Sequence, residues 1–293
     1  MRGFCKEKSM SMVQDRITKF ICLRFEGHNI FTLLSLPLES NSAVLGFDSE
    51  NFLKFLLRQI NVTHIFIVPP SWLIQNMNNN DKRPAKILIV FYSRYGNTAR
   101  MAEEIAYGAK ELSNIQMTIR RLADNVPMEV ISKDPAWTKV AEDLNDRYPI
   151  LPIEDVIKEL PNNDAIIFGS PTRFGNMAAP MKSMWDGTTE LWTNGSLIGK
   201  IGAVFTSAAS VHGGQETTAV SMMFPMFHHG MILVGVPYSI EALTESGSPY
   251  GPSRIVGRLA NKEIQQADIK VARALGRRVA EVTKKFVLAT TFF

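Results

Sequence analysis

The chain has 293 residues, of which 45% are hydrophobic and 20% charged, and its formal net charge is +4. These values are ordinary for a globular protein, and the absence of a basic run interleaved with aromatic residues gives no support to nucleic-acid binding. The longest apolar stretches, such as Ile65 to Pro70 and Ile201 to Phe205, fall well short of the roughly 20 residues that span a bilayer, so we expect no transmembrane helix.

Both cysteines, Cys5 and Cys22, lie near the N-terminus. The rest of the chain therefore has no thiol catalyst, no CxxC motif and no cysteine-based zinc site, and any redox reaction there must be carried by a bound cofactor. The beginning of the chain interrupts its few apolar residues with charges and makes a poor secretory signal. A cytoplasmic location is the default expectation.

The sequence before residue 84 has an irregular pattern. A short helix fits residues 49–60, an apolar patch covers residues 64–73, and the polar stretch 75–84 is typical of a linker. We therefore expect an N-terminal extension over residues 1–83 and one domain over residues 84–293. The extension is either a small accessory domain, a disordered arm or the result of an upstream start codon, because Met77 would give the domain a normal beginning.

Strands and helices alternate from residue 86 onward. The apolar run Lys86 to Tyr92 lacks alternation and is too short for a helix, which predicts a strand buried on both faces. The later elements are expected in chain order as helix 98–113, strand 115–121, an irregular insertion to about 150, helix 153–160, strand 164–169, helix 177–187, strand 200–206, helix 215–226, strand 231–236 and helix 262–286. This alternation indicates a doubly wound α/β fold with a parallel sheet and helices on both faces.

Three loops at the carboxyl ends of the expected strands carry the candidate site, since ligands of such sheets bind there. The turn Ser93 to Thr98 offers hydroxyls and backbone N–H groups at the positive end of the next helix, which suits a phosphate. It lacks the lysine and spacing of a Walker A loop and the GxGxxG spacing of a dinucleotide fold, so a mononucleotide such as FMN fits better. Alternatively, Ser93 and Thr98 only cap the helix.

The second and third loops suit a flat ligand. Residues 170–176 place the aromatic ring of Phe174 beside the first loop, and the small residues of 207–214 let the backbone approach a planar ring and donate N–H groups to its carbonyls. Taken together, the three loops favour a flavin.

From Lys86 to about Lys285, the chain resembles the WrbA family, flavodoxin-like type IV NAD(P)H:quinone oxidoreductases. The resemblance covers roughly two thirds of the chain, leaves out the first 83 residues, and depends on several spaced motifs: SRYGNT at 93–98, IIFGSPTRFGNM at 166–177, LW at 191–192, GGQETT at 213–218, HHGM at 228–231 and SPYG at 248–251. It implies a flavodoxin-like five-stranded sheet of order 2-1-3-4-5, and a homotetramer with flavin sites near subunit contacts.

The resemblance also implies roles for individual residues. Those around the FMN phosphate are Ser93, Arg94, Tyr95, Gly96, Asn97 and Thr98. Those at the isoalloxazine are Thr172, Arg173 and Phe174, with Gly175 close behind, and those at its polar edge are Ser207, Ala208, Ala209, Ser210, Val211, His212 and Gly213. His228 would reach the flavin from a neighbouring part of the assembly, and Tyr95 and Trp192 would lie near the nicotinamide and quinone pocket. In some relatives residues 208–212 are richer in glycine and threonine.

The implied reaction is the two-electron reduction of a quinone. A hydride would pass from NADH or NADPH to flavin N5, and a quinone would then take the electrons in the same pocket, which is a ping-pong cycle. Arg173 and the N–H groups of 207–213 would stabilise negative charge on the flavin. No ribose-binding acid or 2′-phosphate pocket distinguishes NADH from NADPH. The expected partners are therefore a small-molecule quinone and a nicotinamide, together with the other copies of the chain in the implied homotetramer.

Other interpretations stay open at this point. A flavodoxin-type single-electron carrier would use the same fold, although such carriers are strongly acidic, and a third possibility is an interaction protein without flavin. Phe174 and Trp192 also fit core positions, His212 a solvated loop, and Arg173 a contact through its backbone alone. One histidine of the pair His228 and His229 is expected to be packed, and the apolar segment 222–227 is either core or a subunit contact.

Overall fold

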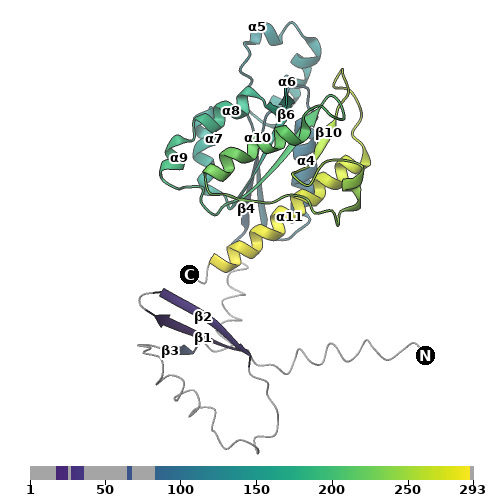
Figure 1. Cartoon of the computed structure of the whole chain (residues 1–293). Coiled ribbons are helices and arrows are strands. Elements are labelled where there is room, and N and C mark those ends of the chain that lie inside the picture. The colour runs from purple at the N-terminus through teal and green to yellow at the C-terminus, as the bar shows by residue number, and fades with distance from the viewer. Residues whose placement is uncertain (1–17, 26–27, 36–64, 68–82, 291–293) are drawn as a thin grey trace, which may run out of the picture. The chain divides into compact units, whose positions relative to one another are not determined.

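The computed structural model describes residues 18–25, 28–35, 65–67 and 83–290. The chain divides into two units, residues 1–80 and 81–293, which are described separately (Figure 1). The helix expected over residues 49–60 and most of the expected linker lie outside the described residues.

The described part of the first unit is a three-stranded antiparallel sheet of order β2-β1-β3. It consists of β1 (Thr18–Phe25), β2 (His28–Ser35) and β3 (Ile65–Ile67). These strands are not predicted from the sequence, whose pattern before residue 84 indicates irregular structure. Their β-branched and aromatic residues favour strands, but neither long strand alternates strictly between apolar and polar positions, so the period-2 signal is weak.

The second unit is a parallel sheet of order β10-β8-β6-β4-β5. Its strands are β4 (Ala85–Phe91), β5 (Ile115–Arg121), β6 (Ala165–Arg173), β8 (Ile201–Ala208) and β10 (Ser253–Ile255). The expected order 2-1-3-4-5 is confirmed, with one difference in the fifth position. There β9 (Ile232–Leu233) pairs with the beginning of β8 and β10 pairs with its end.

The fifth strand is shorter than the expected range 231–236 because the chain turns toward another segment. The N–H of Val236 donates to the carbonyl of Pro249 at 3.0 Å, and a Cβ on Gly235 would lie 2.2 Å from that same oxygen. Further along, the N–H of Thr206 on β8 donates to Pro252. The segment around Pro249 to Pro252 therefore takes over the edge of the sheet before β10 begins.

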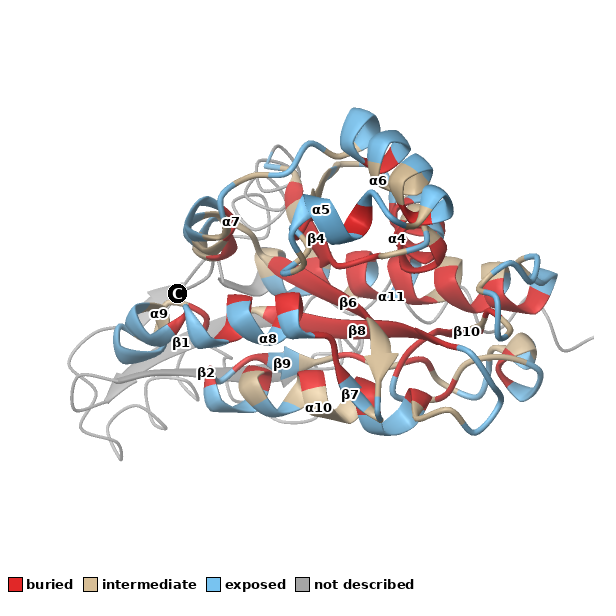
Figure 2. Cartoon of the chain, turned by 90° about the horizontal axis from the view of Figure 1, so that it is seen from above, coloured by how far each residue is buried: buried red, intermediate tan, exposed pale blue. Residues whose placement is uncertain are grey.

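Alternate residues of β4 enter two separate cores, as expected for a strand covered on both faces. Ile87, Ile89 and Phe91 pack with α4 (Asn97–Lys110) and α11 (Gln266–Thr290). Leu88 and Val90 pack on the other face of the sheet, which three helices cover: α7 (Ile153–Glu159), α8 (Ala179–Asp186) and α10 (Gln215–His228). Figure 2 shows the buried strands between the two helical layers.

The insertion after β5 is helical, which corrects the expectation of an irregular segment. It contains α5 (Met128–Ile131) and α6 (Pro135–Arg147). Asp134 caps α6 by accepting the N–H groups of Ala136 and Trp137, and Pro135 occupies the first helical position. This Asp-Pro start is a helix signal that the sequence analysis overlooked.

Short elements complete the unit. They are η1 (Leu160–Asn162), β7 (Asn176–Met177), α9 (Thr189–Thr193) and η2 (Glu241–Thr244). None of the described helices combines the length and the apolar character needed to cross a bilayer.

Candidate functional site

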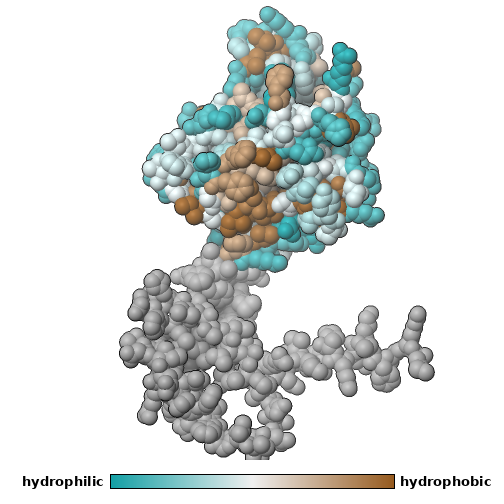
Figure 3. Space-filling model, viewed as in Figure 1, coloured by the Kyte–Doolittle hydropathy of each residue, from teal (hydrophilic) through white to brown (hydrophobic). Residues whose placement is uncertain are grey.

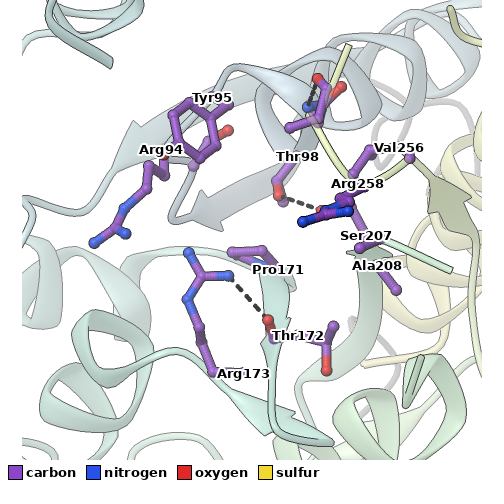
Figure 4. A pocket seen from close by; sticks show the side chains of 15 residues that line it. Arg94, Tyr95, Thr98, Pro171, Thr172, Arg173, Ser207, Ala208, Val256 and Arg258 are labelled. Atoms are coloured by element: carbon purple, nitrogen blue, oxygen red, sulfur yellow. Dashed lines mark hydrogen bonds between the residues drawn. The ribbon is translucent and has the colours of Figure 1, made fainter. Parts of the chain in front are cut away.

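A cavity of about 220 Å³ lies where the carboxyl ends of β4, β6 and β8 meet (Figure 4). Three of its walls are the loops that the sequence analysis singled out, and a fourth comes from residues after β10. The lining residues are Ser93, Arg94, Tyr95, Asn97 and Thr98; Pro171, Thr172 and Arg173; Ser207, Ala208 and Ala209; and Val256, Gly257, Arg258 and Ala260.

The first loop presents an uncapped helix N-terminus to the cavity. Gly96, in the left-handed region with φ of 79°, is the N-cap of α4 and makes no side-chain capping bond. The alternative that Ser93 and Thr98 only cap this helix is therefore wrong. The Ser93 hydroxyl is 2% exposed and has no hydrogen-bond partner in the described part of the chain. A buried hydroxyl and first-turn N–H groups without intrahelical partners are the donors that an anion needs.

Hydroxyl groups join the three loops behind this turn. Thr98 Oγ1 on α4 lies 3.0 Å from Ser207 Oγ on β8, and both side chains are buried. The Thr206 hydroxyl donates to the carbonyl of Ser170 at 2.7 Å, which joins β8 to β6. The walls of the cavity are thus fixed to one another by buried hydrogen bonds.

The second loop is a tight hairpin between β6 and β7. Phe174 and Gly175 have φ values of 52° and 76°, so both central residues are left-handed, as a two-residue primed turn requires. The Thr218 hydroxyl of α10 donates to Thr172 Oγ1 at 2.8 Å and holds the hairpin against that helix. The Arg173 guanidinium donates to the Thr172 carbonyl at 3.0 Å and points across the cavity (Figure 4).

Helix α6 braces the first loop from outside. The Arg94 guanidinium lies 3.8 Å from the centre of the Trp137 ring, and the Tyr95 hydroxyl donates to Asp134 at 3.1 Å. The pKa of Tyr95 is raised mainly by partial burial and, to a smaller extent, by the nearby Asp134 carboxylate. The turn is therefore held by α6, and the Tyr95 phenol stays protonated at neutral pH.

Tyr92, at the end of β4, has a similar partner. Its hydroxyl donates to Asp124, and burial together with this carboxylate raises the pKa of Tyr92 to about 12. Tyr92 is therefore a structural donor in the neutral range.

Several residues that the resemblance placed at the flavin do not line the cavity. Phe174 is fully exposed at the hairpin tip, and Trp192 on α9 is 56% exposed. His228, at the end of α10, is also exposed. The other implied flavin residues that do not line the cavity are Gly96, Gly175, Ser210, Val211, His212 and Gly213.

The third loop beyond Ala209 turns away from the cavity into an exposed bend. The Gln215 side chain amide donates to the carbonyls of Ser210 and Val211 at 2.9 and 2.6 Å, which shapes this bend. Of the two adjacent histidines, His229 is the packed one, with Nε2 2.9 Å from the Thr188 hydroxyl. The pKa of His229 is lowered mainly by burial and, to a smaller extent, by the nearby His228.

The fourth wall was not found by sequence reasoning. It follows β10, a strand that was not predicted, and its residues carry no known nucleotide motif. The carbonyl of Ala260, a residue with φ of 56°, accepts the Asn97 side-chain amide at 2.8 Å. The only signal in the sequence is the position of Gly257 directly after an apolar stretch.

Comparison with known proteins decides the family. The pattern of a family described as NADPH-dependent FMN reductase matches residues 85–244. The chain belongs to this family. The resemblance to flavin-dependent quinone oxidoreductases drawn from the motifs is confirmed at this level.

Two relatives of the chain are named NAD(P)H dehydrogenase (quinone). The protein from Aromatoleum aromaticum is 43% identical over 207 residues, which cover 69% of this chain and 97% of the relative. The protein from Geotalea daltonii is 40% identical over 209 residues, which cover 70% of this chain and 99% of the relative. Among solved structures, a WrbA-like flavodoxin protein from Agrobacterium tumefaciens matches at 25% identity, covering 69% of this chain and 98% of that chain, with a TM-score of 0.49.

Proposed function

We propose that the chain is an FMN-dependent NAD(P)H:quinone oxidoreductase that reduces quinones by two electrons. One observation carries the proposal: the buried, unpartnered Ser93 hydroxyl and the uncapped start of α4 face one cavity at the carboxyl edge of the sheet. These groups suit the phosphate of a mononucleotide, and the family description and the names of the relatives agree with a flavin and a quinone.

Bound FMN would supply hydride chemistry, accepting two electrons from NADH or NADPH and releasing them to a quinone in a ping-pong cycle. The protein's task is to bind and orient the reactants. The first loop would hold the phosphate through Ser93, Thr98 and backbone N–H groups. Thr172 and the guanidinium of Arg173 would lie against the isoalloxazine, where a cation stabilises negative charge.

We further propose that a second copy of the chain completes the site within a homotetramer. Figure 3 shows apolar side chains gathered on the face that α10 occupies. Phe224 and Phe227 of this helix are 59% and 61% exposed, and His228 follows them directly. Large exposed apolar patches mark interfaces. In such an assembly the exposed Phe174, Trp192 and His228 would approach a flavin, their own or a neighbour's.

An absorbance experiment tests the function. The purified full chain is reconstituted with FMN, then treated with NADH or NADPH, and finally with benzoquinone. Bleaching of the flavin band and its return on adding quinone would support the oxidoreductase, and parallel double-reciprocal plots would support the ping-pong order. A bound flavin that stays oxidised with both nicotinamides would favour the electron carrier, whereas failure to bind any flavin would overturn the proposal.

A further inference from the structure

The cavity carries three arginines and no carboxylate among its lining residues. Two of these guanidinium groups already contact the protein. Arg94 stacks on Trp137, although its buried Nε has no hydrogen-bond partner among the described residues, and Arg173 donates to the carbonyl of Thr172. Arg258, which has an exposed side chain, makes no hydrogen bond or ion pair with the described residues. The whole guanidinium of Arg258 is therefore available to a ligand.

Arg258 lines the cavity together with Thr98 and Ser207, and its guanidinium overlaps the Thr98–Ser207 pair in the view of Figure 4. Thr98 belongs to the first turn of α4, so Arg258 and the positive end of that helix line one cavity. Two positive poles facing each other are unfavourable unless an anion lies between them. Ser93, a residue 2% exposed whose hydroxyl has no hydrogen-bond partner among the described residues, also lines the cavity and is a second donor for such an anion.

The turn that carries Arg258 is held at both ends. On one side, the N–H of Val256 donates to the carbonyl of Ala208 at 2.8 Å, and the N–H of Lys262 donates to the carbonyl of Val256 at 2.9 Å. On the other, the buried Arg254 donates to the carbonyl of Lys262 at 2.6 Å.

The Asn97 amide adds a direct bond from α4 to this turn, at Ala260. Ala260 is kept at a positive φ, which is unfavourable for a non-glycine residue. A strained turn fixed to the phosphate loop presents its cation in a defined place, whereas a loose surface loop would not.

We propose that Arg258 binds the phosphate of the flavin mononucleotide and thereby sets a preference for FMN over riboflavin. The proposal rests on the flavin site of the proposed function and adds a residue to it. A phosphate monoester carries close to two negative charges at neutral pH, and a guanidinium matches its oxygens with two parallel hydrogen bonds. Riboflavin shares the ring and ribityl chain but has no phosphate, so it isolates the contribution of this contact.

The experiment is a titration of the flavin-free full chain with FMN and, separately, with riboflavin, followed by quenching of flavin fluorescence. The variants are Arg258→Gln, Arg258→Lys and the control Arg278→Gln, an exposed arginine of α11 outside the cavity. We expect Arg258→Gln to weaken FMN binding about tenfold, the effect of losing one solvent-accessible charge-assisted contact. Riboflavin affinity should stay unchanged, and Arg258→Lys should recover part of the FMN affinity.

Three results would overturn the inference. In the first, Arg258→Gln leaves the affinity for FMN as in the wild type. In the second, it weakens both flavins equally while its circular dichroism spectrum stays native, so that the residue acts on the loop and not on the phosphate. In the third, the control changes the ratio as much. If the wild-type chain binds neither flavin, the proposed function itself fails, and that result is distinguishable from all three.

Discussion

The hydroxyl oxygens of Thr98 and Ser207 lie 3.0 Å apart, although 109 residues separate them in the chain. This buried contact joins the first turn of α4 to the end of β8 and brings two walls of the cavity together. Ser93, five residues earlier in the same loop, has no such partner among the residues that the structure describes. The paired hydroxyls hold the walls of the cavity together, whereas the Ser93 hydroxyl is the one for which we propose a ligand.

We expect Ser93→Ala to weaken FMN binding about tenfold without lowering the stability of the flavin-free chain. The hydroxyl is buried and unpartnered, so removing it relieves a desolvation cost in the empty site and loses a hydrogen bond only in the complex. Urea unfolding of the flavin-free chain and an FMN titration check the two halves separately. Thr98→Val is the matched comparison, because it breaks an existing bond to Ser207 and should destabilise the empty chain. A stability loss in Ser93→Ala would mean that this hydroxyl has a protein partner.

Gly276→Ala should destabilise the chain, even though alanine is the better helix former. A Cβ at Gly276 of α11 would lie 1.9 Å from the carbonyl oxygen of Ile105 on α4. In the same way, a Cβ at Gly108 of α4 would lie 2.1 Å from the carbonyl oxygen of Arg273 on α11. Separating two packed helices costs about 1–3 kcal/mol, which exceeds the gain of about 1 kcal/mol in helix propensity. Urea midpoints measure the effect. Arg278→Ala, on the exposed face of the same helix, should stay within about 0.5 kcal/mol of the wild type.

The buried His229 should make stability depend on pH below neutrality. Burial lowers the pKa of His229 from its ordinary value of 6.5. The unfolded chain then binds more protons between the two pKa values, so this contribution to stability is complete above pH 6.5 and is lost as the pH falls toward the folded pKa. Urea unfolding at a series of pH values from 7.5 downward measures this slope.

The neighbouring histidine provides the control. His229→Gln should flatten the slope, at the cost of stability at pH 7.5 where the contact with Thr188 is lost. His228→Gln, which removes an exposed ring, should keep most of the slope. Equal slopes in the wild type and His229→Gln would assign the pH dependence to other groups.

The sequence could predict the sheet and three walls of the cavity because the signals are local. A buried run ending in Ser93 to Thr98 marks a strand followed by a helix start, and the carboxyl edge of a parallel sheet brings such turns together. The fourth wall depends on tertiary contacts. The bond from Asn97 to Ala260 spans 163 residues, and nothing in the composition of residues 256–260 indicates it. Similarly, the stacking of Arg94 on Trp137 requires α6 to be placed, and that helix was overlooked.

Phe174 is the residue at which we expect function and stability to conflict. It is a bulky aromatic with φ of 52°, fully exposed at the tip of the β6–β7 hairpin. Left-handed backbone costs such a residue about 1–2 kcal/mol, and its ring gains no burial within one chain. Phe174→Asn should therefore raise the free energy of unfolding by about 1 kcal/mol, because asparagine followed by glycine is favoured in this type of turn.

The same substitution should lower kcat/KM for quinone if the ring meets a flavin or substrate in the assembled enzyme. Tyr238→Asn controls for the loss of an exposed aromatic outside the cavity, and should change neither quantity appreciably. Unfolding of the flavin-free chain and steady-state kinetics of the FMN-loaded chain give the two readouts. A variant that becomes more stable and keeps the wild-type kinetics would show that the Phe174 ring contacts neither the flavin nor the quinone. One that becomes less stable would show that the ring is buried in the assembly, and that an interface, and not catalysis, accounts for the strain at this turn.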